Sequence, residues 1–593
     1  MIIHRKKESG PPDLLKLECA NCGAPLTYVD NTHAVCSYCG QEFLIDEVKG
    51  PVVDVHVDYG NSDGMRRAVE STRTALIVFL VVAVLVVAVI LGFHIAAEKS
   101  VLFSSDKDIP ADNSGDLLAT FCEDIFGKEY GEITPEEFDS IRYLRCGYER
   151  EGSELFNAVW YSFTDYRECA GEEEFQETVK SWHYRTRQVS WPSDYTAFTG
   201  LTRIDTRDTV WLSMLEFSPE SRITCVDTDD GLDTVTEIAD PAQIEILHIG
   251  IMGKSLDQIG LYKNLRELSV DTTLDSGTVD VSGLAACTNL ESLSLDCAEH
   301  YTGLEKLGGL TRLRELSLSG VNIRDCSFLK ELTQLQELSV CAGEDPDLSV
   351  LTFLPELKSL VFTDGKAVPL QEFSFLQEAG KLTGLTIAVG EKECLTALSG
   401  MGNLTSLDLS VSFHEYRDNR QVPLDVSALA ALTKLESLAL DSFWGGEVTG
   451  LEAVLNLPGL KVFRLGKSVG SGLEPILDVT ALADRPAIEE FGMESCHPKD
   501  AATGEELDFG FLARYPGIKR LYLDGCGMTD AAFLSFLPEL RRLSLWKNKI
   551  TDFSPLSECR KLEDIRVEED AAGSLPVSGE VGIYVWPDEL PGL

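Results

Sequence analysis

An apolar motif, L-x-x-L-x-L, recurs fourteen times between residues 244 and 567 and constrains the fold more than any other feature of this chain. Successive copies start 22 residues apart in five intervals, 21 to 25 apart in most others and 28 to 31 apart in the rest. A unit this short holds one strand and a return arc, and its leucines can be buried only by stacking on the next unit. The sequence therefore predicts a solenoid of the α/β class over residues 241–567. The copies start at Ile244, Leu265, Leu290, Leu313, Leu335, Leu357, Leu382, Leu404, Leu435, Leu460, Ile488, Ile518, Leu540 and Leu562.

The most regular copy carries further pattern residues after its leucines, in Leu543-Ser-Leu545-Trp-Lys-Asn548-Lys-Ile550-Thr-Asp-Phe553-Ser-Pro-Leu556. It resembles the 22-residue leucine-rich repeat of internalin-type bacterial proteins. The resemblance implies that Asn548 points inward and bonds to the backbone at the corner of the coil, with Cys526 in the same position one repeat earlier. Val321 takes that position in another copy, so we expect an incomplete ladder of these bonds.

Several cysteines fall on inward positions of the repeats, among them Cys287, Cys326 and Cys559. Cysteine without a disulfide behaves as a small hydrophobic residue. We expect these three to be buried thiols, with disulfides as the alternative.

Residues 75–97, ALIVFLVVAVLVVAVILGFHIAA, contain no Asp, Glu, Lys or Arg. At about 1.5 Å of rise per residue they give roughly 35 Å of helix, enough to cross a bilayer. A secretory signal would sit at the extreme N-terminus with a shorter apolar run, and a buried core helix would show a polar stripe. The sequence therefore predicts one transmembrane helix here.

The charges beside this segment favour a cytoplasmic N-terminus. Arg66, Arg67 and Arg73 precede it, whereas Lys99 and Lys107 follow it. Positive residues are enriched in cytoplasmic loops, and reduced thiols like those described next are a cytosolic condition. We expect a single-pass protein of the cell membrane whose repeats lie outside the cytoplasm.

Two C-x-x-C-G knuckles, Cys19–Cys22 and Cys36–Cys39, are separated by 13 residues. Four thiolates complete a closed tetrahedral shell for one structural Zn²⁺ and leave no open position for catalysis. Leu26, Tyr28 and Val35 suit a short β-hairpin between the knuckles. The segment resembles the zinc ribbons of many bacterial and transcription-related proteins. With no basic stripe or interleaved aromatic residues, a structural or protein-docking role is expected, and nucleic-acid binding is the alternative.

The remaining segments connect or cap these parts. Thr134-Pro135 suits the start of a helix, and this stretch resembles the helical cap of bacterial leucine-rich-repeat proteins. Four of the seven tryptophans, Trp160, Trp182, Trp191 and Trp211, fall in one irregular region, either in its core or on an interaction surface. The expected domains are a zinc ribbon 1–46, a linker 47–74, the span 75–97, a stalk 98–113, a helical cap 114–146, an irregular insertion or degenerate repeats 147–240, the repeats 241–567 and a C-terminal cap or tail 568–593.

The net charge is concentrated in the part of the chain that follows the apolar segment. Residues 1–74 carry −3 of the formal net charge of −46, which leaves −43 for residues 98–593 and opposes binding to nucleic acid or to anionic lipid.

The exposed strand positions differ between the two halves of the repeat array. Early repeats present acidic and small residues, including Glu315, Ser317 and Glu337. Late repeats present arginines and aromatic residues, which are typical of binding hot spots. The candidate ligand-binding residues, with an ordinary solvated surface as the alternative, are Arg464, Arg520, Tyr522, Arg542, Trp546 and Arg566.

No catalytic motif is visible in the chain, neither a nucleophile elbow, nor a phosphate-binding glycine loop, nor HExxH. The sequence therefore favours a non-enzymatic, membrane-anchored leucine-rich-repeat protein that binds a protein or glycan on its concave face, for adhesion or sensing. A regulatory protein whose zinc ribbon engages cytosolic machinery or nucleic acid is the alternative. An enzyme hidden in residues 147–240 is the third possibility.

Overall fold

The computed structural model forms two units, Met1–Ser100 and Val101–Leu593, which are described separately. In the first unit the described residues are 2–5, 26–28, 33–36 and 42–47. In the second unit they are 114–585, with gaps at 152–153, 185–193, 208–210, 252–255, 257, 273–277, 297–299, 364–365, 412–422, 443–445, 467–472, 486, 574 and 578–580.

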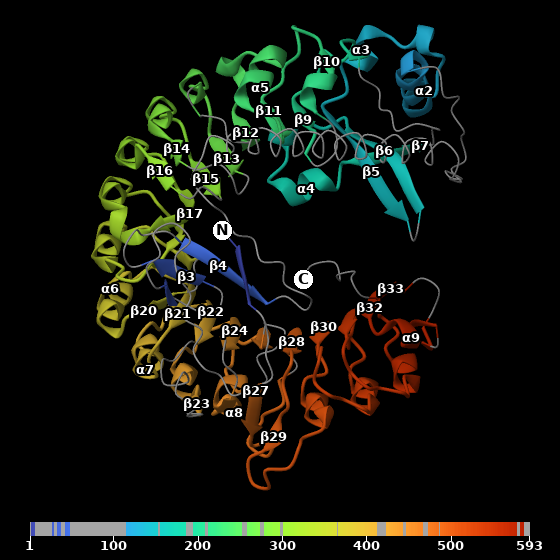
Figure 1. The fold of residues 1–593 in the computed structure, drawn as a ribbon. Helices are drawn as coiled ribbons and strands as arrows, with labels where there is room; N and C mark the ends of the chain where they lie inside the picture. Colours follow the sequence, from blue (N-terminus) through green and yellow to red (C-terminus); the bar gives the residue numbers. More distant parts are fainter. Residues whose placement is uncertain are drawn as a thin grey trace, which may run out of the picture. The chain divides into compact units, whose positions relative to one another are not determined.

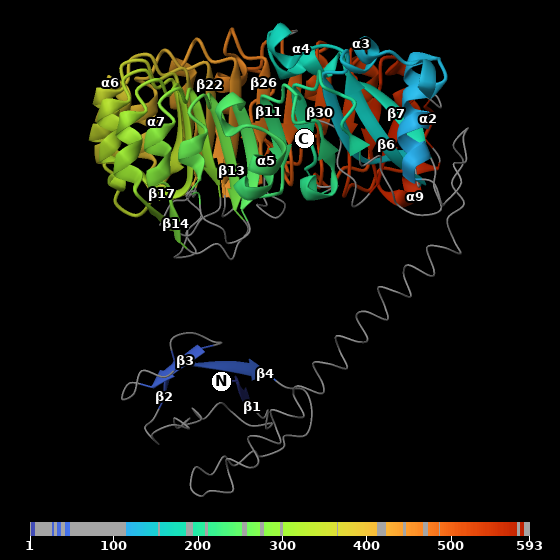
Figure 2. The same ribbon diagram turned by 90° about the horizontal axis from the view of Figure 1, so that it is seen from above.

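The first unit contains one small sheet with strand order β1-β4-β3-β2 (Figure 2). Its strands are β1 (Ile2–Arg5), β2 (Leu26–Tyr28), β3 (His33–Cys36) and β4 (Glu42–Glu47). The hairpin expected between the knuckles is confirmed, since β2 and β3 pair antiparallel with Leu26 opposite Cys36. Cys36 ends β3, whereas Cys19, Cys22 and Cys39 lie outside the described residues, so the zinc site stays a prediction.

The apolar segment 75–97 also lies outside the described residues. None of the helices within the described ranges is long and apolar enough to cross a bilayer. The membrane span therefore stays a prediction from the sequence.

The second unit begins with two helices, α2 (Ser114–Phe126) and α3 (Pro135–Phe138). Leu117, Leu118 and Phe121 of α2 are buried. Thr134 caps α3 as expected, because its side chain accepts from the backbone N–H of Glu137 while the Glu137 carboxylate accepts from the backbone N–H of Thr134. The helices thus cover the first residues of the sheet.

Residues 143–184 form three antiparallel strands, β5 (Tyr143–Glu151), β6 (Glu154–Ser162) and β7 (Lys180–Tyr184). β5 also pairs in parallel with β9 (Arg203–Asp205), which pairs with β11 (Cys225–Thr228). These last two strands extend the repeat array toward the N-terminus, because β11 pairs in parallel with β12.

The array itself is one long parallel sheet in which equivalent repeat positions pair. For example, Leu268 pairs with Leu293, Leu293 with Leu316 and Leu316 with Leu338. The inward leucines are buried against the next coil, which confirms the predicted stacking. After β11 the strands in order are β12 (Ile246–Ile251), β13 (Glu267–Thr272), β15 (Ser292–Asp296), β17 (Glu315–Asn322), β18 (Glu337–Cys341), β19 (Ser359–Phe362), β21 (Gly384–Val389), β22 (Ser406–Val411), β24 (Ser437–Ser442), β26 (Val462–Leu465), β28 (Glu490–Met493), β30 (Arg520–Tyr522), β31 (Arg542–Ser544), β32 (Asp564–Arg566) and β33 (Gly582–Tyr584).

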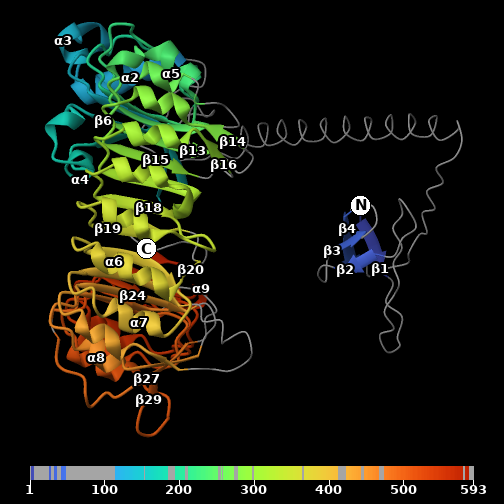
Figure 3. The ribbon, with the colours of Figure 1, turned by 90° about the vertical axis from the view of Figure 1, so that its left-hand side faces the viewer.

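The strands line the inner, concave surface of an arc, and the return segments cover its outer surface (Figure 1). Figure 3 shows several helices stacked on that outer surface. They include α5 (Leu232–Ile238), α6 (Phe373–Glu378), α7 (Glu393–Leu398) and α8 (Leu451–Leu455). The last helix, α9 (Glu569–Ala572), follows β32 at the C-terminal end of the arc. Two small parallel sheets lie beside the main sheet. One pairs β14 (Thr278–Asp280) with β16 (His300–Thr302), and the other has four strands in the order β23 (Leu424–Asp425), β25 (Gly446–Thr449), β27 (Leu473–Leu477) and β29 (Lys499–Asp500).

The corner ladder implied by the repeat pattern is present in the last coils. The Asn548 side-chain amide donates to the carbonyls of Leu523 and Leu545, both at 2.8 Å. The Cys526 thiol donates to the Met493 carbonyl of the preceding coil, and the Cys496 thiol donates in the same way to the Leu465 carbonyl. Cys287, Cys326 and Cys559 are buried free thiols, which confirms the prediction for them.

Candidate functional site

The late strands bring the six candidate residues together on the concave face. Arg520 pairs directly with Arg542 on neighbouring strands. In the adjacent row, Arg464 lies opposite Gly492, Gly492 opposite Tyr522, and Ser544 opposite Arg566. Because the strands are parallel and in register, residues from five coils form one contiguous cluster, which we call the arginine cluster: Arg464, Glu490, Arg520, Tyr522, Asp524, Arg542, Trp546, Asp564 and Arg566.

Three of the predicted residues are covered rather than exposed, which corrects the sequence-based expectation. Tyr522 is 1% exposed, and Trp546 and Arg566 are each 8% exposed. The Arg464 guanidinium lies 5.3 Å from the centre of the Tyr522 ring. Arg566 and Lys547 lie 4.7 and 4.3 Å from the Trp546 ring. The inner side of a curved sheet crowds neighbouring side chains, so long cations lie over the aromatic rings and cover them.

Carboxylates hold these arginines, and the buried one among them, Glu490, was not indicated by the sequence pattern. Glu490 is buried and accepts hydrogen bonds from the Nε groups of both Arg464 and Arg520. Arg542 lies 3.3 Å from Asp564, and Arg566 lies 3.6 Å from Asp524. The strand register alone could have placed Glu490 beside Arg520, since the two residues occupy equivalent positions in adjacent repeats.

One further carboxyl group, that of Glu494, lies near Asp524 of the cluster. Burial raises the pKa of Glu494 to about 7, and the nearby Asp524 adds to this effect while Arg464 and Arg566 oppose it. Burial also raises the pKa of Asp524, although a hydrogen bond from Ser544 and the charge of Arg566 act in the opposite direction. The Glu494 carboxyl group therefore exchanges its proton near neutral pH.

The early half of the concave face has a different character, as predicted. Ser269, Ser294, Ser317 and Ser339 pair in one continuous row across β13, β15, β17 and β18. Glu315 and Glu337 lie beside this row and are exposed. Within the described residues, neither carboxylate has a cationic side chain within ion-pair distance. This half is therefore a shallow acidic surface with small side chains.

A buried polar network, which sequence reasoning missed, occupies the N-terminal end of the concave face. Arg203 donates from Nε to Asp227 at 3.1 Å and from Nη1 to Glu172 at 2.8 Å. Its guanidinium lies 4.9 Å from the Tyr166 ring centre and 5.1 Å from that of Phe175. Glu172 and Phe175 belong to α4 (Glu172–Gln176), so this network fastens α4 onto the concave face (Figure 1).

His248 continues the same network on β12. One ring nitrogen bonds to the fully buried Asp227, and the other lies 3.0 Å from Glu267. Burial lowers the pKa of His248, but the hydrogen bonds to Asp227 and Glu267 outweigh burial and raise its pKa from 6.5 to about 9. His248 is therefore protonated at neutral pH and serves as a structural cation.

This arrangement predicts a pH dependence of stability. A histidine whose folded pKa is raised contributes stability that is complete below pH 6.5 and is lost as the pH rises through about 9. The shift corresponds to about 3 kcal/mol at most. We expect the free energy of unfolding to fall between pH 7 and 9.5 in the wild type and to stay nearly flat in H248Q, as measured by denaturant titration. The exposed His300 provides the control, and a flat wild-type profile or a flat H300Q profile would contradict this role.

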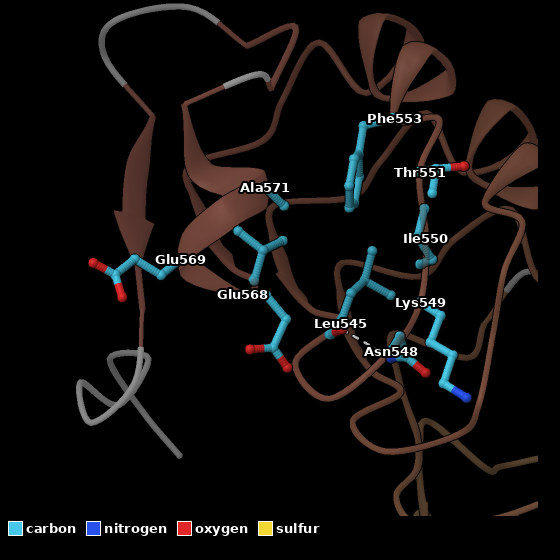
Figure 4. A pocket seen from close by; sticks show the side chains of 10 residues that line it. Leu545, Asn548, Lys549, Ile550, Thr551, Phe553, Glu568, Glu569 and Ala571 are labelled. Atoms are coloured by element: carbon cyan, nitrogen blue, oxygen red, sulfur yellow. Dashed lines mark hydrogen bonds between the residues drawn. The ribbon is translucent and has the colours of Figure 1, made fainter.

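A hollow of about 700 Å³ lies at the C-terminal end of the array (Figure 4). Leu545, Phe553 and Val567 line it, with Lys549 and Glu569 also at its wall. Leu545, Phe553 and Val567 are core positions of the last coils, and within the array each such position is covered by the next coil. These three side chains are likewise buried, and β33 pairs with β32 beyond them, so the hollow lies over a covered core.

Within the described residues, no group of three or more His, Cys, Asp and Glu side chains could hold a metal ion. Cys225 lies near Asp227, but burial raises the pKa of its thiol well above 9, so it is a poor nucleophile.

The strand registers decide the fold class. Equivalent positions of successive copies pair in parallel, leucines face inward, and short helices return over the outer surface. The chain is a leucine-rich-repeat solenoid.

No protein-family model matches this leucine-rich-repeat chain, and no curated protein matches it. Solved structures with a similar course of the chain include an internalin, internalin F, from Listeria monocytogenes, at 21% identity with 54% of this chain and 86% of that chain covered and a TM-score of 0.38. A leucine-rich-repeat protein of Leptospira interrogans is 17% identical, with coverages of 63% and 91% and a TM-score of 0.38. The functional domain of internalin J from Listeria monocytogenes is 18% identical, with coverages of 63% and 69% and a TM-score of 0.34.

Proposed function

We propose that this protein is a membrane-anchored leucine-rich-repeat protein that binds a protein ligand at the cell surface through its concave face. The observation that carries the proposal is the continuous inner sheet, whose side chains change from carboxylates and serines on β13–β18 to arginines on β26–β32. Such a polarised surface favours one orientation of a charged partner. The fold alone does not specify a ligand.

A protein ligand fits this face better than a glycan. Sugar rings commonly stack their C–H faces on exposed aromatic rings. In the arginine cluster the Tyr522 and Trp546 rings are buried, and cations cover them. The groups that remain accessible there are mainly the guanidinium groups of Arg464, Arg520 and Arg542, which suit charged side chains of another protein.

The cell-surface location depends on two further parts of the proposal. Residues 75–97 would cross the membrane once, with the N-terminus in the cytoplasm and the repeats outside. Cys19, Cys22, Cys36 and Cys39 would bind one structural Zn²⁺ in the cytoplasmic head. The β2–β3 hairpin supports this head, because it places Cys36 at the end of a strand that pairs back toward Leu26.

Site-specific photo-crosslinking on living cells tests the binding face. A benzoylphenylalanine at Ser317, on the concave sheet, should give crosslinked protein adducts of the full-length chain, and protease treatment of the adduct should release a peptide from another protein. The same residue at Thr352, on an exposed return turn, is the matched control. Adducts at Thr352 but not at Ser317, or adducts that glycosidases remove, would contradict the proposal.

A further inference from the structure

The arginines of the late concave face have unused hydrogen-bonding capacity. Arg464 and Arg520 each bond to Glu490 through Nε. Within the described residues, their terminal Nη groups make no hydrogen bond, and both side chains are partly exposed. When Nε of a guanidinium group is fixed by a hydrogen bond, the planar group holds its terminal N–H groups in a fixed direction. Arg464 and Arg520 therefore present these N–H groups on the concave face.

The charges at this place are not balanced pair by pair. Arg520 and Arg542 lie directly opposite each other on β30 and β31, and like charges in this position destabilise a sheet. Glu490 forms ion pairs with both Arg464 and Arg520, and Asp564 forms an ion pair with Arg542. Arg520 and Arg542 nevertheless remain side by side, and an anion bound between them would relieve the repulsion between these two guanidinium groups.

An unsatisfied hydroxyl lies beneath the same arginines. Tyr522 is almost completely buried, and its hydroxyl has no hydrogen-bond partner. Burial and the charge of Glu490 raise the pKa of this hydroxyl, whereas Arg464, Arg520 and Arg542 lower it, so all four charged groups lie close to it. An oxygen bound among the arginines would give this buried donor an acceptor, and a buried polar group without a partner is unfavourable.

We propose that Arg464, Arg520 and Arg542, with Tyr522 beneath them, form a subsite for the carboxylate side chains of an acidic segment on the protein partner. This inference rests on the proposed function and names the chemistry of the ligand. Guanidinium groups bind carboxylates through paired N–H bonds of defined geometry. We therefore expect the subsite to bind a pair of Asp or Glu side chains in preference to neutral side chains.

The surroundings favour a short acidic segment over a long polyanion. Residues 98–593 carry a net charge of −43, and charges separated by more than about 8 Å are screened at physiological salt. A short segment contacts the arginines alone. A sulfated glycan chain would extend over the acidic strands as well and would be repelled there.

Binding of a fluorescent deca-glutamate peptide to the full-length protein at physiological salt tests the subsite. The double variant R520Q/R542Q should weaken binding at least tenfold. The single variant R542Q keeps both hydrogen bonds to Glu490, so it should fold normally and still weaken binding severalfold. The matched control is R266Q/R312Q, which removes two exposed arginines at repeat starts outside the cluster and should change binding less than twofold. Circular dichroism melting checks the fold of each variant.

Three results would overturn the subsite. Wild-type protein could fail to bind deca-glutamate, the control could lose as much affinity as R520Q/R542Q, or dextran sulfate could bind through the cluster more tightly than deca-glutamate. Crosslinking at Ser317 tests the proposed function separately from the subsite. If crosslinking at Ser317 captures a protein partner equally well in R520Q/R542Q, the concave face binds a ligand but the acidic subsite is wrong.

Discussion

Replacing Arg203 with alanine is expected to destabilise the N-terminal coils by about 3–5 kcal/mol, because it leaves buried charge without its partner. Asp227 is 0% exposed and accepts a hydrogen bond from Arg203, which also binds Glu172 and lies among three aromatic rings. Arg207 and His248 remain near Asp227 and compensate only in part. The substitution should also release α4 from the concave face, since Glu172 loses its cation.

Native-state hydrogen exchange is the appropriate measurement, because each coil of a solenoid contacts only its neighbours and loses stability locally. Amides of β9 and β11 should lose protection in R203A, while those of β30 and β31 should not change. R203K keeps the positive charge, but the lysine ammonium cannot bond to Asp227 and Glu172 with the geometry of the guanidinium group. The protection of the β9 and β11 amides in R203K should therefore lie between that in the wild type and that in R203A. The exposed pair Arg324–Asp345 gives a control, since R324A should change stability by about 1 kcal/mol or less. Unchanged protection in R203A would refute the role of this network.

Replacing Phe491 with alanine should destabilise the C-terminal coils by about 3–5 kcal/mol through a cavity in the core. Phe491 is completely buried, and its ring centre lies 5.4 Å from that of Phe463 and 6.1 Å from those of Phe511 and Tyr515. These four aromatic residues come from two successive coils, those that start at Leu460 and Ile488, so one cavity weakens the contacts between the two coils.

The expected pattern of exchange is the reverse of that for R203A. Amides of β26, β28 and β30 should lose protection in F491A, and those of β9 and β11 should keep theirs. F491L keeps most of the side-chain volume and should cost about 1.5 kcal/mol or less. A uniform loss over all coils in either variant would show that the array unfolds as one cooperative unit, contrary to this account.

The inward positions of the array could be predicted from the sequence because they repeat. Leucines at fixed spacing, Asn548 and Cys526 occupy places that the backbone geometry dictates in every coil, and the structure confirms them. Side chains alternate between the core and the concave face along each strand, and this alternation also predicted that Arg520 and Arg542 lie on the concave face. Whether a concave side chain is exposed did not follow, since Tyr522 is covered by Arg464 from two strands away.

The N-terminal network could not be predicted because no period connects its members. Arg203, Asp227 and His248 lie on three strands, and Glu172 comes from a helix that folds back over the sheet. Each of these residues, taken alone in the sequence, looks like a solvated charge. Only the parallel registers, with Asp205 opposite Asp227 and Asp227 opposite His248, bring the charges into one buried cluster.

The most direct test of the central claim, that the repeats face the outside of the cell, is protease shaving of intact cells that express the full-length chain with different tags at its two ends. The account predicts that the C-terminal tag and the repeats are lost while the N-terminal tag is protected until the membrane is permeabilised. Protection of both tags in intact cells, or loss of the N-terminal tag alone, would contradict it.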